Sequence, residues 1–218
     1  NIVETYSRLE VMAQAYATPG CALYNDAALA AAVASGLDWM NATFYTKTNA
    51  LYGNWFDWEV QAPTYLNNAI TLIYPALSSA QIASYIQAMY NFGPDSYNEK
   101  DQFWWGALTG ANTVSVAQVM AIQGVLLGTN TTTVTRYWHN TNGHPVNPQT
   151  DYVISGNSLL TEAKGNLSGD NPEDWSGASV FLNVTNGDGF YDDGSYVFHG
   201  NIAYLGHYGL VELEGEAT

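Results

Sequence analysis

A helical repeat of apolar side chains runs through residues 1–128 and constrains the fold more than any other feature of this sequence. The apolar positions between Ile2 and Tyr16 recur every three or four residues, the spacing of one face of an α-helix. Thr18-Pro19-Gly20 ends this run. An Ala-rich stretch from Asp26 to Phe44 predicts the next helix, because Ala is the strongest helix former. The pattern is typical of an all-α fold.

Further helices are predicted from start and stop signals. Pro63 suits a first helical turn, where its missing N–H costs nothing, and apolar residues follow it at helical spacing: Leu66, Ile70, Ile73 and Leu77. Ser78 and Gln81 form a capping box ahead of another helix. A Gly/Pro/Asn-rich break then precedes a helix over Thr113–Leu127, which Gly128 ends. Helices paired through loops in this way predict stacked helical hairpins.

The helical pattern stops after residue 128. Residues 129–188 are rich in Asn, Thr, Gly and Ser, and only short apolar pieces interrupt them. A long stretch of weak periodicity is typical of a surface insertion or a functional loop. We therefore expect a single domain over residues 1–218, with insertion-like loops over 129–188 and a segment rich in Gly, Asp, Tyr and His over 189–209.

Composition excludes several classes of protein. Twenty acidic residues against five basic ones give a formal net charge of −15, which argues against nucleic-acid binding, because that function needs a basic surface. The single cysteine, Cys21, excludes a disulfide framework or a multi-cysteine zinc site within this chain. No apolar run reaches the roughly 20 residues of a membrane span. We expect no nucleic-acid or membrane partner.

Four Asn-x-Ser/Thr sequons occur, at Asn41, Asn130, Asn166 and Asn183. Such sequons are acceptors for N-glycosylation in secreted proteins. In an acidic chain poor in Lys they predict an extracellular, glycosylated protein. The alternative is that a composition rich in Asn and Thr produces sequons by chance.

The segment Tyr52–Glu59 carries Trp55, Phe56 and Trp58 beside Asn54, just before a predicted helix. Flat aromatic faces can stack on pyranose rings while polar neighbours bind hydroxyl groups, so the segment resembles a sugar-stacking loop. The alternative is that the aromatic side chains belong to the core, where Trp is usually buried. For Trp58 the core is the favoured interpretation, and for Asn54 and Trp55 it is the binding site.

Two further segments carry candidate chemistry. Trp104 and Trp105 lead through a Gly-rich turn to Asn112, which either caps a helix or offers its amide to an anion together with helix-start N–H groups. His199 and Tyr208 are separated by a Gly-rich stretch and can converge on one pocket. They can act as an acid–base pair if a neighbour lowers the phenol's pKa from about 10.

Metal binding finds little support in the sequence, and we expect no metal and no cofactor. The spacing of Asp188, Asp192 and Asp193 does not match an EF-hand calcium loop. His139 and His144 have no further pair of ligands beside them.

Three motifs, in this order, resemble polysaccharide lyase family 8, which contains hyaluronate, chondroitin AC and xanthan lyases. The motifs are Gly53-Asn54-Trp55-Phe56-Asp57-Trp58-Glu59, the Thr109-Gly110-Ala111-Asn112 turn, and Asp193-Gly194-Ser195-Tyr196 followed by His199 and Tyr204-x-Gly-x-Tyr208-Gly209. The resemblance extends from the first helix to the end of the chain. It implies an incomplete (α/α) toroid of helical hairpins with a long substrate cleft. It also implies eliminative cleavage of a glycosidic bond next to a uronic acid.

The resemblance implies roles for the residues at matching positions. Asn112 engages the uronate carboxylate, His199 lies near C5, and Tyr208 takes the C5 proton and protonates the leaving O4. The implied aromatic patch and further substrate contacts fall on a larger set: Asn54, Trp55, Phe56, Trp58, Trp104, Trp105 and Tyr204. Neutral hydrogen-bond donors at the carboxylate stabilise the negative charge that develops in the transition state.

The sequence departs from the family pattern in three places. Phe56 stands where a second Trp is common. The spacing from Asn112 to His199 is longer than usual, and we expect the excess, within 129–188, to cover the cleft. The chain stops one helix after Tyr208, whereas family members continue with more toroid helices and with β-sandwich domains. We therefore expect a fragment or one piece of a nicked enzyme, poorly active alone, whose remainder is a second chain.

Other functions are open at this point. Five basic residues argue against a densely sulfated substrate and favour a sparsely charged, uronate-containing polysaccharide. One alternative is a glycoside hydrolase on a similar toroid, with Asp57 or Glu59 and one of Asp192 and Asp193 as acid and base. Another is a non-catalytic carbohydrate-binding protein that uses only the aromatic segments.

Overall fold

The computed structural model describes most of the helical part of the chain and shorter pieces of the rest. The residues described are 1–46, 49, 52–92, 110–139, 145–168, 185, 189–193, 195–198, 202–203 and 210. For residues 91, 113, 135–139, 145–152, 162, 164–168 and 198 the description covers the backbone. The chain divides into two compact units: Asn1–Gly93 with Ile122–Asn157, and Pro94–Ala121 with Ser158–Thr218.

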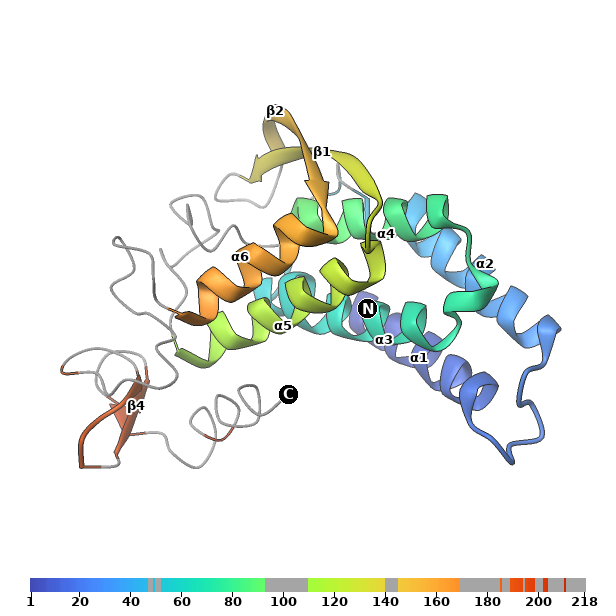
Figure 1. Cartoon of the computed structure of the whole chain (residues 1–218), viewed down its shortest axis with the longest axis horizontal. Helices are drawn as coiled ribbons and strands as arrows, with labels where there is room; N and C mark the ends of the chain where they lie inside the picture. The colour runs from blue at the N-terminus through green and yellow to red at the C-terminus, as the bar shows by residue number, and fades with distance from the viewer. Residues whose placement is uncertain are drawn as a thin grey trace. The chain divides into compact units, whose positions relative to one another are not determined.

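The first unit consists mainly of helices (Figure 1). In chain order they are α1 (Ile2–Ala17), α2 (Ala27–Thr43), the π-helix η1 (Asp57–Gln61), α3 (Ala62–Leu72), the 3-10 helix η2 (Tyr74–Ala76) and α4 (Ser79–Phe92). α1 packs against both α2 and α3, and α2 also contacts α4. Of the helices in the described part, none combines the length and apolarity needed to cross a bilayer. The predicted, mostly helical fold class is confirmed.

Polar side chains fix where these helices begin. The Asp26 carboxylate accepts a hydrogen bond from the Leu29 N–H (2.7 Å) at the start of α2. At the start of α4 the predicted capping box is present. The Ser78 N–H donates to the side-chain oxygen of Gln81 (3.0 Å), and the Gln81 N–H donates to the Ser78 hydroxyl oxygen (3.2 Å). Both predicted helix starts are confirmed.

Four aromatic side chains form part of the buried core of the first unit. Tyr45 stacks on Trp58 with ring centroids 5.9 Å apart, and it meets Tyr6 of α1 edge-on at 5.7 Å. Phe92, at the end of α4, contacts the rings of both Tyr45 and Trp58. The Tyr45 hydroxyl also donates to the backbone oxygen of Trp58 (2.5 Å). The core therefore holds both the ring and the backbone of Trp58 in place.

The prediction of irregular loops over 129–188 is wrong for much of this region. Thr131–His139 (β1) and Pro145–Ser155 (β2) form an antiparallel hairpin, and Gly156–Ser168 forms a helix, α6. β-branched and aromatic residues favour strands at the base of the hairpin, where Thr132 pairs with Ile154 and Val134 pairs with Tyr152. The remainder of the predicted insertion, residues 140–144 and most of 169–188, lies outside the described residues.

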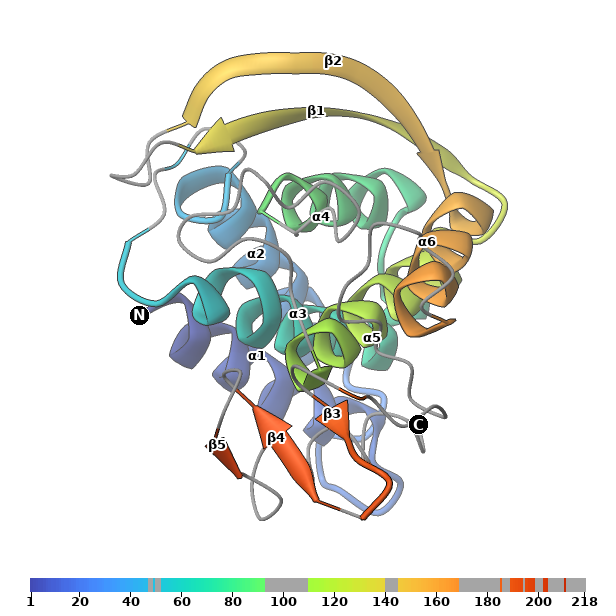
Figure 2. The ribbon, with the colours of Figure 1, turned by 90° about the vertical axis from the view of Figure 1, so that its left-hand side faces the viewer.

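The hairpin passes over α4 as an arch (Figure 2). Val134 and Ile154 are buried at its base, and the side-chain amide of Gln87, on α4, donates to the backbone oxygen of Thr133 (2.7 Å). β2 has 11 residues against the 9 of β1, and the register shifts on both sides of Tyr137. Each shift places an extra residue on β2, which is the geometry of a β-bulge.

Glycines permit a close backbone contact at the foot of the hairpin. The helix α5 (Gly110–Leu127) ends at Gly128, which has a φ of +58° and donates its N–H to the oxygen of Gly124 (3.0 Å). The predicted stop at Gly128 is confirmed. A Cβ on Gly156 would lie 2.2 Å from the oxygen of Gly128 and 2.5 Å from that of Gly124. The first residue of α6 must therefore be glycine for the two backbones to meet.

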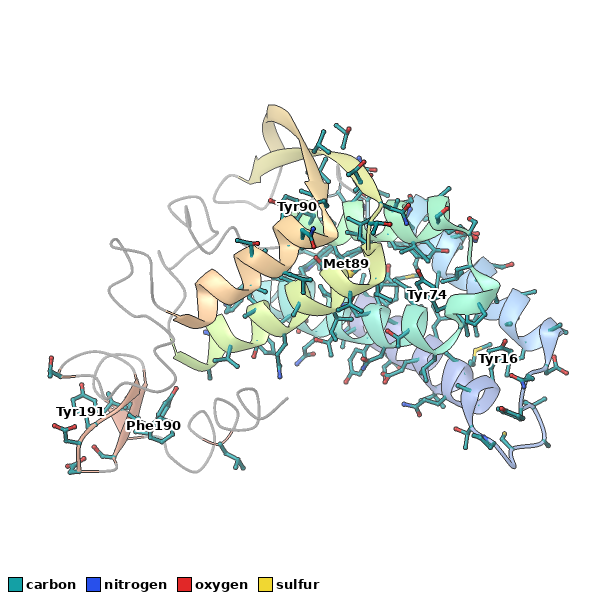
Figure 3. All side chains as sticks on the ribbon, in the orientation of Figure 1. Tyr16, Tyr74, Met89, Tyr90, Phe190 and Tyr191 are labelled. Carbon is teal, nitrogen blue, oxygen red and sulfur yellow. The ribbon has the colours of Figure 1, made fainter. Side chains whose placement is uncertain are left out.

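The second unit contains a small antiparallel sheet within residues 189–209, the segment rich in Gly, Asp, Tyr and His. Its strand order is β3-β4-β5, with β3 at Gly189–Phe190, β4 at Tyr196–Phe198 and β5 at Ile202–Ala203. Phe190 packs on Tyr196, with ring centroids 4.8 Å apart, and Figure 3 shows Phe190 and Tyr191 on this hairpin. Gly189 pairs with Val197 and Phe190 with Tyr196, so the described part of this segment includes a regular antiparallel sheet.

Candidate functional site

The aromatic segment Tyr52–Glu59 is helical from Trp55 onward and not a loop throughout. The helix begins at Trp55, and Asn54 caps it: its side-chain oxygen accepts the Phe56 N–H (3.1 Å). The π-helix η1 follows directly and continues into α3, so Pro63 lies in the first turn of α3 but not at the start of the helical run. A π-helix carries an extra residue per turn and often occurs at functional sites.

Trp58 is a core residue, which agrees with the interpretation favoured from the sequence and corrects its place among the predicted substrate contacts. It is 1% exposed, and its indole N–H donates to the backbone oxygen of Tyr52 (2.8 Å). Its ring lies between Tyr45 and the edge of Tyr52. Trp58 cannot touch a sugar in this position, but it fixes the segment that carries the other candidates.

The three remaining candidates of this segment are accessible. Asn54 is exposed, and Trp55 and Phe56 are half-buried with their rings edge to face at 5.5 Å. Tyr52 was not among the residues predicted from the sequence; it is 62% exposed and forms a T-shaped contact with Trp58 at 5.0 Å. The aromatic residue just before the Gly53 turn was the signal that could have found it.

Asn112 lies in the first turn of α5 and is partly exposed. Because α5 begins at Gly110, Asn112 is not the N-cap, and the alternative reading as a capping residue is wrong. The preceding residue, Ala111, is buried, and its N–H donates to the hydroxyl of Tyr196 (3.4 Å). A phenol from β4 thus satisfies a backbone donor at the helix start, where helices leave their N–H groups unpaired.

This hydrogen bond joins two of the three sequence motifs. Tyr196 is buried in β4, and β4 ends at Phe198, the residue before His199. Sequence reasoning named Tyr196 only as part of a motif and gave it no role. The other predicted site residues lie outside the described part of the chain: Trp104, Trp105, His199, Tyr204 and Tyr208.

Two of the carboxylates considered as the acid and base of a hydrolase, Glu59 and Asp193, lie in very different environments. Glu59 is 2% exposed, close to the buried Tyr45. Asp193 is exposed and accepts the Ser195 N–H (2.9 Å), and hydrogen bonds from Ser195 hold the pKa of Asp193 below its usual value. A carboxyl group with a lowered pKa is a poor general acid, because it is already ionised at neutral pH. Within the described residues, no three His, Cys, Asp or Glu side chains gather as metal ligands do.

Among the described side chains of the first unit, three tyrosines are buried, and their phenols are held in the protonated form. Burial raises the pKa of Tyr6, and it raises that of Tyr45 with further repulsion from Tyr6 and Glu59. Burial and the hydrogen bond to Asp38 raise the pKa of Tyr85. None of these phenols is suited to remove a proton at neutral pH.

The sequons have different surroundings. Asn41 is half-buried on α2, and its amide donates to the Ser84 hydroxyl (2.9 Å). Asn130 is exposed between α5 and β1, which is the accessibility that a glycan needs. The backbone of Asn166 belongs to α6, and Asn183 lies outside the described residues.

Relatives of known activity match almost the whole chain. A xanthan lyase from Bacillus sp. (strain GL1) is 30% identical over 220 residues, and hyaluronate lyase HylB from Enterococcus faecalis is 28% identical over 215 residues. The alignments cover 100% and 99% of this chain but only 19% of each relative. The chain therefore spans about a fifth of the length of these relatives.

Two solved structures of polysaccharide lyases also resemble this chain in fold over nearly its whole length. A Paenibacillus xanthan lyase superposes with a TM-score of 0.71 and 31% identity, covering 99% of this chain and 16% of that one. A chondroitin AC lyase from Streptomyces coelicolor superposes with a TM-score of 0.73 and 30% identity, covering 99% and 24%.

The family model described as "Polysaccharide lyase family 8, N terminal alpha-helical domain" matches residues 1–142 and 150–217. The unmatched residues 143–149 include the first residues of β2. With this match over most of its length, the chain belongs to polysaccharide lyase family 8, to its N-terminal α-helical domain.

Proposed function

We propose that the chain is the N-terminal helical part of an extracellular lyase that cleaves a uronate-containing polysaccharide by β-elimination. Membership of the family supports lyase chemistry. The observation that carries the proposal further is the hydrogen bond from Ala111 to Tyr196. It joins the helix turn that presents Asn112 to the strand that leads into His199.

Asn112 would bind the carboxylate of the uronic acid. The C5 proton of a uronate is weakly acidic, because its removal adds negative charge to a group that is already an anion. An amide and the first N–H groups of α5 are neutral donors at the positive end of a helix dipole. Such donors stabilise the enolate-like transition state more than the ground state, which is what lowers the barrier.

Tyr208 would remove the C5 proton and then protonate the leaving O4, with His199 beside it. No water is consumed: the C5–H and C4–O4 bonds break, a C4–C5 double bond forms, and the proton ends on O4. The phenol must have a lower pKa than the usual value of about 10 to act near neutral pH. The buried tyrosines Tyr6 and Tyr45 of the first unit do not meet this condition, because burial raises their pKa values.

Asn54, Trp55 and Phe56 would hold the sugar chain by stacking and by hydrogen bonds to hydroxyl groups. This kind of binding needs little positive charge, and the chain has five basic residues against twenty acidic ones. We therefore infer a sparsely charged acidic polysaccharide as the substrate. A separate polypeptide that carries the rest of the enzyme is a further expected partner.

The decisive experiment is an absorbance assay with the natural protein that carries this sequence. Hyaluronan, chondroitin, xanthan and glucuronan are offered in turn, and elimination produces an unsaturated uronate that absorbs in the near ultraviolet. We expect Tyr208→Phe and Asn112→Ala to abolish the signal, while Asp193→Asn leaves it unchanged. Cleavage without the chromophore would support a hydrolase instead. Cleavage that persists in Tyr208→Phe would refute the assignment of Tyr208.

A further inference from the structure

Tyr52 is the most exposed aromatic side chain in the described part of the chain, at 62% exposure. It precedes Asn54 and Trp55 by only a few residues, and the Gly53 between them has a φ of +76°, which turns the backbone sharply. No role has been assigned to Tyr52 by the family resemblance or by the sequence motifs considered above.

The Tyr52 ring is exposed but not free to move. It forms a T-shaped contact with the buried Trp58, with 5.0 Å between ring centroids and 83° between ring planes. The same Trp58 donates its indole N–H to the Tyr52 backbone oxygen (2.8 Å). Because Trp58 is itself fixed by Tyr45 and Phe92, both the backbone and the ring of Tyr52 rest on a rigid support.

A fixed, exposed aromatic face is suited to bind a flat ligand. Ordering a side chain on binding costs conformational entropy, and a ring that is already held loses little of it. The segment offers Asn54 as an exposed polar group nearby and the Trp55–Phe56 pair as a second aromatic surface. None of these groups carries a charge, so the surface fits a neutral pyranose ring better than an ionic group.

We propose that Tyr52 is an additional sugar-stacking residue that binds one pyranose ring of the acidic polysaccharide, beside the ring bound by Trp55. The inference rests on the proposed function for the nature of the ligand. Its physical basis, however, is the way in which Trp58 presents Tyr52. The chemical step is proposed to use other residues, Asn112, His199 and Tyr208, so we expect Tyr52 to contribute to affinity for longer chains rather than to that step.

The test compares variants of the natural protein with oligosaccharides of increasing length. Tyr52→Leu keeps an apolar side chain against Trp58 but removes the flat ring, and Tyr52→Phe keeps the ring but removes the hydroxyl. We expect Tyr52→Leu to raise KM for long substrates about three- to tenfold, with kcat and the KM of the shortest cleavable substrate unchanged. Tyr52→Phe should behave as the wild type.

Tyr74→Leu is the matched control. Tyr74 is 44% exposed on the short helix η2 (Figure 3), and among the described residues it has no aromatic partner. A KM for long substrates that is the same in Tyr52→Leu as in Tyr74→Leu would overturn the proposal, and so would an equal loss in Tyr52→Phe and Tyr52→Leu. Thermal unfolding of each variant excludes a loss of folded protein as the cause.

If the proposed lyase function were wrong, the experiment would give a different result from a failure of the Tyr52 proposal. In that case the wild-type protein would form no unsaturated product from any of the polysaccharides. Retardation of the protein in gels that contain each polysaccharide would then test Tyr52 directly. Weaker retardation of Tyr52→Leu than of Tyr74→Leu would support the stacking role without lyase activity, and equal retardation would overturn it.

Discussion

The backbone N–H of Ala111 donates a hydrogen bond of 3.4 Å to the hydroxyl of Tyr196, and both residues are buried. The two lie 85 positions apart in the sequence. Ala111 is followed by Asn112, the residue proposed to bind the uronate carboxylate. The helix turn that carries this amide is therefore tied to a buried side chain of β4.

Tyr196→Phe tests this dependence. We expect kcat to fall about three- to tenfold, because one hydrogen bond worth roughly 1 kcal/mol is lost at the helix start. Asn112→Ala should cost about a hundredfold or more, as for the removal of an oxyanion donor. The kcat of the double variant Tyr196→Phe/Asn112→Ala should be no lower than that of Asn112→Ala alone, because Tyr196 acts through Asn112. Additive losses in steady-state kinetics would contradict this coupling.

Substitutions of Asn54 separate its two roles. Asp caps helices as well as Asn does, and a negative charge at a helix N-terminus is favourable, so Asn54→Asp should keep the melting temperature. The new carboxylate should repel an acidic polysaccharide and raise KM. Asn54→Ala should lose about 1 kcal/mol of stability as well. Wild-type KM in Asn54→Asp would mean that this residue only caps the helix.

Gly156→Ala should destabilise the protein by about 3 kcal/mol or more, since the new methyl group would collide with the backbone oxygens of Gly128 and Gly124. Gly36→Ala is the control. Its Cβ would lie 2.6 Å from Leu9 Cδ2, the tip of a flexible side chain, and Ala gains up to about 1 kcal/mol of helix propensity. Calorimetric unfolding should show a large decrease in the free energy of unfolding for Gly156→Ala and little change for Gly36→Ala.

Tyr6→Phe should be neutral or stabilising by up to about 1 kcal/mol at neutral pH. The Tyr6 hydroxyl is buried and has no hydrogen-bond partner among the described residues. Tyr45→Phe should instead destabilise the protein, because the hydrogen bond to the Trp58 oxygen is lost. Chemical unfolding at neutral pH distinguishes the two, and equal destabilisation by both changes would argue that the Tyr6 hydroxyl is satisfied.

The buried tyrosines also predict a loss of stability in alkali. Burial raises the pKa of Tyr6 above the value of about 10 that it has in the unfolded chain. Above that pH the unfolded state releases a proton that the folded state keeps, so stability is full below pH ~10 and falls as pH rises further. Melting temperatures between neutral pH and strong alkali should fall less steeply in Tyr6→Phe than in the wild type.

Features set by neighbouring residues were predictable from the sequence. Asp26 begins α2, Ser78 and Gln81 begin α4, and Gly128 ends α5, as expected. Each signal depends on a side chain or a φ angle within one turn of the position that it marks. Helix ends of this kind can therefore be predicted from the local sequence alone.

The β1–β2 hairpin could not be recognised in the same way. Its base had strand-forming residues such as Val134 and Ile154, but their pairing joins positions far apart in the sequence. The high content of Asn, Thr and Gly in this region favoured the prediction of loops over the prediction of strands. The burial of both residues against the helices, which stabilises the strands, is a tertiary effect.

The candidate site was predicted in part. Asn112 was expected at a helix start and lies there, whereas Trp58 was retained among the substrate contacts and belongs to the core. The π-helix explains the difficulty, because its extra residue breaks the 3.6-residue period from which side-chain direction is inferred. Tyr196 was missed because its hydrogen bond to Ala111 joins positions far apart in the sequence. Tyr52 could have been found from its place before Gly53, but its contact with Trp58 is visible only in the structure.

The unequal lengths of β1 and β2 have a geometric consequence. Figure 2 shows β2 along the outside of the arch and β1 along the inside, nearer α4. In a curved two-stranded ribbon the outer strand follows a longer path than the inner one. The extra residues of the β-bulges near Pro148 supply this additional length. The first residues of β2, 145–149, lie outside the part of the chain that the family model matches. Shortening β2 there would straighten the ribbon and lift its far end away from the helix below.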